Sequence, residues 1–106
     1  MGKLPVLSDI DLQRRLGALP GWSRKGNAIT RTFSFRGFPD SVAFVQRTEG
    51  PAEEMNHHPD LDVRYNRVIV TLSTHDSGGV TENDVILAAR LDAAAAGLPG
   101  ARPPGA

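Results

Sequence analysis

The chain has 106 residues, of which 40% are hydrophobic and 23% charged, as is typical of one globular domain. Its 12 basic and 12 acidic residues cancel, so we do not expect a large basic face that binds nucleic acid. The sequence contains no cysteine, which excludes disulfides, thiolate zinc sites and thiol catalysis.

The opening segment Met1–Pro5 lacks the apolar run of a signal peptide. No stretch approaches the roughly 20 apolar residues that a membrane span needs. We therefore expect a cytoplasmic protein without a membrane partner. The composition indicates a single domain over residues 1–100 and a disordered tail over residues 101–106.

The first part of the chain predicts a helix followed by two strands. Ser8 is a suitable N-cap for a helix that stops before Pro20. Residues 22–25 and 28–36 are short strand candidates, separated by a Gly-Asn turn signal. In the second of them apolar residues alternate with Ser and Thr, and Arg31 interrupts the apolar face.

A second helix is predicted to begin with Asp40 or Ser41 as its cap and to run to His58. Pro59 ends it, because the residue before a proline disfavours the helical region. Pro51 follows a glycine in the middle of this segment. Since an internal proline removes a hydrogen bond and clashes with the preceding turn, we expect a kink there or two helices meeting at residue 50.

The last part predicts two strands, 61–65 and 67–74, or one long strand bent near Asn66. A loop follows, and then a final helix that Thr81 caps, with Asp84 three residues further on. The order is helix-β-β-helix-β-β-helix. With the helices on one face of a four-stranded antiparallel sheet, this order predicts an α+β fold, a two-layer sandwich.

All three histidines fall at predicted element ends: His57 and His58 where a helix stops, His75 where a strand stops. Imidazole is the side chain best suited to exchange protons near neutral pH. Each histidine alone is more often a surface residue or a cap. A metal site ranks below acid–base chemistry, because helical ligand pairs are rarely adjacent. The acidic residues Glu53 and Glu54 are typical of a solvent-exposed helix face.

This stretch resembles the pterin-4a-carbinolamine dehydratases, also called 4a-hydroxytetrahydrobiopterin dehydratases. The resemblance depends on Glu54, His57-His58-Pro59, Tyr65-Asn66, Thr71-Leu72-Ser73-Thr74-His75 and Thr81-Glu82-Asn83-Asp84. It covers most of the chain, and the combination of a double histidine, a proline and a Ser-Thr-His run is specific.

The resemblance implies the same two-layer α+β fold and a hydro-lyase reaction. A 4a-hydroxytetrahydropterin, formed when an aromatic amino acid hydroxylase uses its reduced pterin, loses water and becomes the quinonoid dihydropterin. No metal or organic cofactor is implied. The implied catalytic residues are His57, His58 and His75. The implied substrate-binding residues are Asn56, His57, His58, Ser73, Thr74, His75 and Asp76, with Glu54, Pro59 and Asp84 in supporting roles.

A different class of function stays open. Some relatives are dimerisation partners of a transcription factor, and others have lost catalysis, so a non-catalytic binding or chaperone role is the alternative. The family forms dimers through sheet edges and tetramers through helices. We therefore expect a homodimer or a homotetramer, in keeping with the zero net charge of the chain.

Overall fold

The computed structural model describes residues 3–98. Its elements are α1 (Asp9–Gly17), β1 (Ser23–Lys25), β2 (Ala28–Ser34), α2 (Phe38–Met55), β3 (Asp60–Arg64), β4 (Arg67–Leu72), the 3₁₀ helix η1 (His75–Ser77) and α3 (Glu82–Ala96). The predicted order of helices and strands is confirmed, and η1 is an addition where a loop was expected. The predicted domain end and tail lie outside the described residues.

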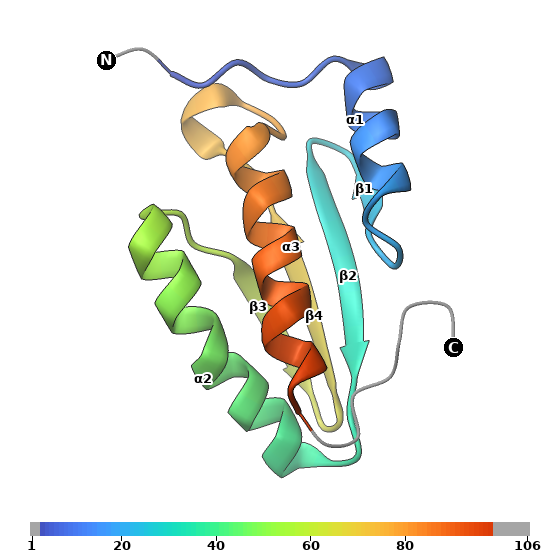
Figure 1. Ribbon diagram of the computed structural model, residues 1–106, viewed down its shortest axis with the longest axis vertical. Helices are drawn as coiled ribbons and strands as arrows, with labels where there is room; N and C mark the ends of the chain where they lie inside the picture. The colour runs from blue at the N-terminus through green and yellow to red at the C-terminus, as the bar shows by residue number, and fades with distance from the viewer. Residues whose placement is uncertain (1–2, 99–106) are drawn as a thin grey trace.

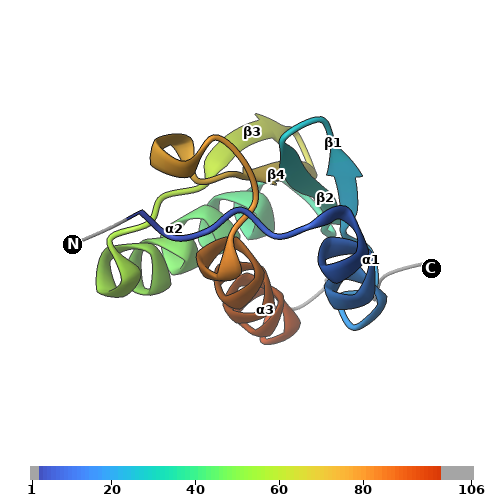
Figure 2. The same cartoon turned by 90° about the horizontal axis from the view of Figure 1, so that it is seen from above.

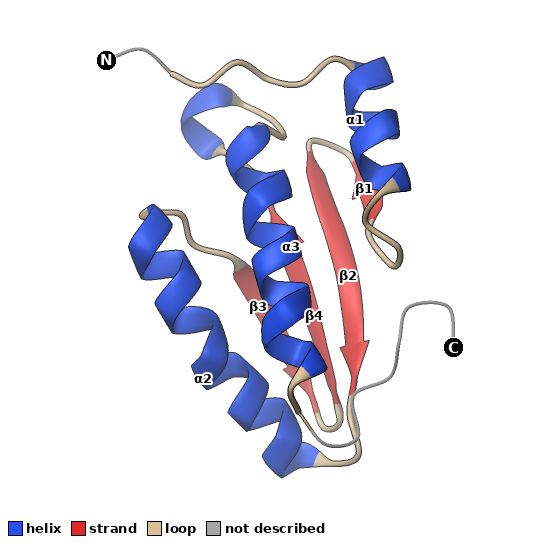
Figure 3. Cartoon of the chain, in the orientation of Figure 1, coloured by secondary structure: helices blue, strands red, loops and turns tan. Residues whose placement is uncertain are grey.

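The strands form one four-stranded sheet in the order β1-β2-β4-β3, and every neighbouring pair is antiparallel (Figure 1, Figure 3). Seen from above, the helices lie together on one side of this sheet (Figure 2). The prediction of a two-layer α+β sandwich is confirmed. β1 pairs with β2 and β3 with β4, while β4 also lies beside β2, and the ends of α2 and β4 come to the same end of the molecule (Figure 1).

The core lies between the sheet and the helices. The two central strands supply alternate residues to it, and in their register Ile29 lies opposite Leu72 and Phe33 opposite Val68. The ring of Phe44 from α2 packs 4.6 Å from that of Phe33. The opposite face of β2 carries the predicted Thr and Ser residues, so the sheet has one apolar and one polar side.

The residue that interrupts the apolar pattern of β2 faces the core all the same. Arg31 is only 7% exposed, and its Nη1 donates to Asp92 Oδ1 at 2.5 Å. Its guanidinium also lies 4.1 Å from the ring centre of Phe33. Trp22 Nε1 donates to the same Asp92 oxygen at 2.9 Å. A buried cation is therefore satisfied by a carboxylate from α3.

The second helix differs from its prediction in three ways. It begins at Phe38 with Gly37 as its N-cap, so the predicted cap at Asp40 or Ser41 is wrong. It is a single helix with Pro51 inside it, so the alternative of two helices is wrong. Thr48 and Ala52 are buried on either side of the proline, and this packing holds the helix together despite the lost hydrogen bond. The helix also ends at Met55 rather than at His58, because Asn56 adopts the left-handed conformation with φ 48°.

Candidate active site

A surface pocket of about 270 Å³ opens where the end of α2, the end of β4 and the start of η1 meet. Its lining consists of Asn56, His57, His58, Ser73, Thr74, His75 and Asp76. These are the seven residues predicted from the sequence to bind substrate. Two segments separated by a whole hairpin thus bring all three histidines to one cavity.

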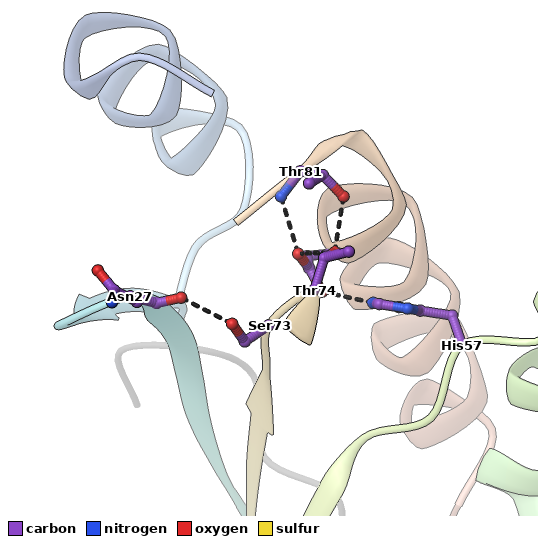
Figure 4. A network of polar contacts seen from close by, with 6 residues as sticks. Asn27, His57, Ser73, Thr74 and Thr81 are labelled. Atoms are coloured by element: carbon purple, nitrogen blue, oxygen red, sulfur yellow. Dashed lines mark hydrogen bonds and ion pairs between the residues drawn. The ribbon is translucent and has the colours of Figure 1, made fainter. Parts of the chain in front are cut away.

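The side chain of His57 is held by a buried carboxylate. Its Nε2 lies 2.5 Å from Asp84 Oδ1, and Asp84 is fully buried while the His57 side chain is 11% exposed. The other carboxylate oxygen accepts two further hydrogen bonds of 2.8 Å, from Thr74 Oγ1 and from the backbone N–H of Thr81. Figure 4 shows the ring of His57 pointing towards this network.

The same carboxylate also begins α3. Asp84 and the N-cap Thr81 form the predicted capping box, so that prediction is confirmed. Thr74 has one hydroxyl proton, which goes to Asp84, so Thr81 Oγ1 donates the 2.7 Å hydrogen bond to Thr74 Oγ1. Strand end, helix start and histidine are therefore joined by one set of hydrogen bonds.

His58 has an exposed carboxylate partner that sequence reasoning missed. Its Nε2 lies 2.5 Å from Glu53 Oε2, and the two side chains are 57% and 66% exposed. Glu53 belongs to the last turn of α2, where an acidic residue faces the chain that leaves the helix. In the sequence, the position of Glu53 about one helical turn before the histidine pair could have predicted this contact.

His75 begins η1 and is exposed to solvent. The bridge between Thr74 and Gly79 closes the turn that carries it. Ser73 Oγ donates to Asn27 O at 2.8 Å, which ties the end of β4 to the β1–β2 turn (Figure 4). Asp76 is exposed beside His75 at the rim of the pocket.

None of the three predicted supporting residues lines the pocket itself, although Asp84 lies directly behind His57. Glu54 forms an ion pair with Arg90, which joins α2 to α3 on the surface. Pro59 is half-buried and leads from His58 into β3. Within residues 3–98, no three His, Cys, Asp or Glu side chains are grouped so that they would hold a metal ion.

An ion pair ties the first helix to the helix that carries Asp84. Arg15 of α1 donates two hydrogen bonds to the Glu82 carboxylate, at 2.5 and 2.7 Å. The guanidinium lowers the pKa of Glu82, chiefly through hydrogen bonding, and the carboxylate raises the pKa of Arg15 in turn.

In the part of the chain that the structure covers, no helix is long and apolar enough to cross a membrane.

Comparison with known proteins gives one consistent family. The family model described as pterin 4 alpha carbinolamine dehydratase matches residues 5–94. Relatives named pterin-4-alpha-carbinolamine dehydratase include one from Roseiflexus castenholzii, 47% identical over 82% of this chain and 94% of its own length. Another, from Sulfolobus acidocaldarius, is 49% identical over 81% of this chain and 94% of its own.

Solved structures agree with this result. A transcriptional coactivator/pterin dehydratase from Brucella melitensis superimposes with a TM-score of 0.81 and 38% identity, over 84% of this chain and 97% of its own. A pterin dehydratase-like protein identified as a RuBisCO assembly factor shares the fold alone, with a TM-score of 0.58 and 24% identity over 71% of this chain and 87% of its own. By model, relatives and structure, this chain belongs to the pterin-4a-carbinolamine dehydratase family of hydro-lyases.

Proposed function

We propose that this chain removes water from a 4a-hydroxytetrahydropterin and releases the quinonoid dihydropterin, with His57, His58 and His75 as its acid–base groups. The observation that supports this most is the single pocket that all three imidazoles line. Three titratable side chains around one cavity are what a proton-transfer reaction on a small ring needs.

The size and lining of the pocket suit a small flat heterocycle. At about 270 Å³ it lies just below the roughly 300–1,000 Å³ of pockets that hold drug-sized ligands. Asn56, Ser73, Thr74 and Asp76 supply donors and acceptors around the histidines. A pterin ring presents an amide edge of alternating donors and acceptors, which such a lining can read.

The reaction needs two proton transfers. An acid gives a proton to the hydroxyl on C4a, the C4a–O bond breaks, and water leaves. A base takes the proton of a ring N–H, whose electron pair then forms the new double bond. The protons balance, because the enzyme gives one and receives one. Each such transfer contributes typically about 10²–10⁴-fold in rate.

His57 is our choice for the base. The Asp84 carboxylate accepts from His57 Nε2, so the neutral imidazole carries its proton there and keeps a free lone pair on Nδ1. Asp84 also stabilises the imidazolium that forms when Nδ1 takes up a proton. The acid is then His58 or His75, both of which line the pocket.

Replacement of single histidines tests the proposal. His57→Ala and His75→Ala should each lower the rate of dehydration by about 10²–10⁴-fold, because each removes one proton-transfer group. The assay uses freshly generated 4a-hydroxytetrahydropterin, with circular dichroism to check the fold. Lys25→Ala, on the exposed strand β1, is the control. Unchanged turnover in both histidine variants would refute the proposal.

In the cell, the substrate would come from an aromatic amino acid hydroxylase, and the product would be reduced again for another round. The role proposed is therefore tetrahydrobiopterin recycling, with such a hydroxylase as the pathway partner. In extracts that contain such a hydroxylase and its reduced pterin, the rate of hydroxylation should rise when this protein is added, because the protein removes the carbinolamine product.

We also propose that two copies pair along β3. This strand is one edge of the sheet, and its Val63 is 38% exposed on the core side of the sheet. A two-fold axis at Val63 would place Asp62 of one copy opposite Arg64 of the other, twice. The edge is therefore complementary in charge to itself. Such a homodimer is the unit from which a homotetramer would be built.

A binding role is the second candidate function. It is favoured by the similarity to the Brucella melitensis protein, which is described as a transcriptional coactivator as well as a pterin dehydratase. The same exposed edge strand would then receive another protein. Wild-type protein that fails to accelerate dehydration above the uncatalysed rate would favour this role over catalysis.

A further inference from the structure

The three histidines of the pocket are held in different ways. His57 and His58 each have a carboxylate within 2.5 Å of Nε2, whereas the ring of His75 has no hydrogen-bond or ion-pair partner among residues 3–98. The position of His75 in the pocket therefore depends on the backbone of the turn that carries it.

That turn, residues 74–79, is short and closed on itself. Thr74 N donates to Gly79 O at 2.9 Å, and the backbone N–H groups of Ser77 and Gly78 donate to Thr74 O at 3.0 and 2.9 Å. Gly78 has φ 79°, a left-handed conformation that glycine adopts without strain. The turn is thus well formed internally, but it projects from the end of β4 and needs an external support.

The chain before α1 supplies this support. We call residues 3–7 the arm; it runs as an extended segment beside η1 (Figure 1, Figure 2). Ser77 Oγ donates to Leu4 O at 2.6 Å, and Leu7 N donates to Val80 O at 2.9 Å. The two hydrogen bonds hold the two sides of the turn.

A steric contact adds to these hydrogen bonds. A Cβ atom at Gly79 would lie 3.0 Å from Cγ1 of Val6, so the arm packs directly on the glycine backbone. The arm buries little of its own surface, since Leu4 is 39% and Val6 49% exposed. Leu7, at the end of the arm, packs against the hydrophobic core, whereas Leu4 and Val6 contact the His75 turn.

We propose that the arm and Ser77 are positioning elements that fix the imidazole of His75 against the substrate. This inference rests on the proposed function, in which His75 exchanges a proton. A proton-transfer group must lie within hydrogen-bond reach of its target, and a displacement of about 1 Å can cost about 10²-fold in rate. Loosening the turn should therefore slow the chemical step more than it weakens binding.

Ser77 gives the first test, in the full-length protein. Ser77→Ala removes the hydroxyl that donates to Leu4 O and should lower kcat about tenfold, with KM changed by no more than about twofold. Ser77→Thr keeps the hydroxyl and should restore most of kcat. The urea midpoints of the two variants should agree, which separates positioning from a general loss of stability.

Gly79 gives a second test by a different route. Gly79→Ala puts a methyl group against Val6 and should push the arm away, with a similar fall in kcat. The double variant Val6→Ala/Gly79→Ala removes the Val6 methyls that the new side chain meets and should recover activity. If the double variant recovers kcat, the fall in Gly79→Ala cannot be a simple loss of fold, because the double variant still carries Gly79→Ala and has one more substitution.

His75→Ala separates failure of this inference from failure of the proposed function. If His75→Ala turns over as fast as wild type, the acid–base role of His75 is wrong and the arm has no catalytic group to position. If His75→Ala is impaired while Ser77→Ala and Gly79→Ala keep wild-type kcat, the proposed function stands and the positioning role is overturned. The NMR signal of the His75 ring reports its mobility. We expect this signal to be broadened in Ser77→Ala, where the ring is no longer held in one position, and sharp in Ser77→Thr.

Discussion

At the scale of single residues, the site depends on how Asp84 is used. One fully buried carboxylate caps α3, accepts from Thr74 and fixes the tautomer of His57. A buried acceptor of this kind is costly to leave unmatched, at about 1–3 kcal/mol per unsatisfied group. Stability and chemistry therefore meet in the same side chain, and a change there affects both.

Asp84→Asn is the sharpest test of this dual use. The amide keeps the shape but has only one acceptor oxygen, so if that oxygen stays with Thr74 and Thr81, an NH₂ group faces His57 Nε2. His57 must then move its proton to Nδ1 and can no longer act as base. We expect kcat to fall by about 10²–10⁴-fold. Glu49→Gln, which changes an exposed carboxylate of α2 outside the pocket, is the control, and equal activity in both variants would contradict the role of Asp84.

The sequence shows which residues can carry the chemistry, but not which partners hold them. The three histidines and Asp84 stand out because their types and spacing match a known pattern. Glu53 looked like an ordinary solvent-exposed acid, since its contact with His58 forms only after the helix has ended. The Arg31–Asp92 pair joins residues 61 positions apart, and no local pattern reports such a contact.

At the scale of elements, helix and strand types followed from periodicity, while the two boundaries of α2 did not. Proline predicted the end of α2 at His58, yet Asn56 ends it at Met55 by taking the left-handed conformation. This early end matters for the site. It frees His57 and His58 from helical geometry, which would turn two adjacent side chains about 100° apart.

The contact between α1 and α3 predicts a pH-dependent stability. Arg15 lowers the pKa of Glu82 below its ordinary value of 4.5 in the folded state. The stabilisation is therefore present above that ordinary value and is lost as the pH falls through the lower folded pKa. Glu82→Gln should reduce the free energy of unfolding at pH 7, and the reduction should shrink as the pH falls below 4.5, as urea titrations would show.

The size of this effect should be small. The two side chains are 38% and 46% exposed, so solvent and salt screen the pair. Adding salt at pH 7 should reduce the difference between wild type and Glu82→Gln. A difference that persists unchanged at pH 3 would mean that Glu82 acts through packing and not through its charge.

At the scale of the whole molecule, the proposed dimer depends on the open edge strand β3. Its residues Asp62 and Arg64 lie on the polar side of the sheet, because Asp62 pairs with Ile69, which alternates with the buried Val68 and Val70. Pairing of two β3 strands would continue the antiparallel sheet into a second copy and cover the β3 edge of each copy. Strand β3 begins at Asp60, soon after His58 of the pocket. Pairing along β3 would therefore also brace the segment that follows His58.

A charge-swap series tests this pairing. Asp62→Arg or Arg64→Asp alone would set like charges opposite each other twice, so each should weaken the dimer about tenfold. The double variant Asp62→Arg/Arg64→Asp restores opposite charges and should dimerise like wild type, as measured by sedimentation. Lys25→Glu on β1, the other edge, should change nothing. If the double variant stays as weak as the single ones, the two charges do not face each other across a two-fold axis, and the copies meet elsewhere.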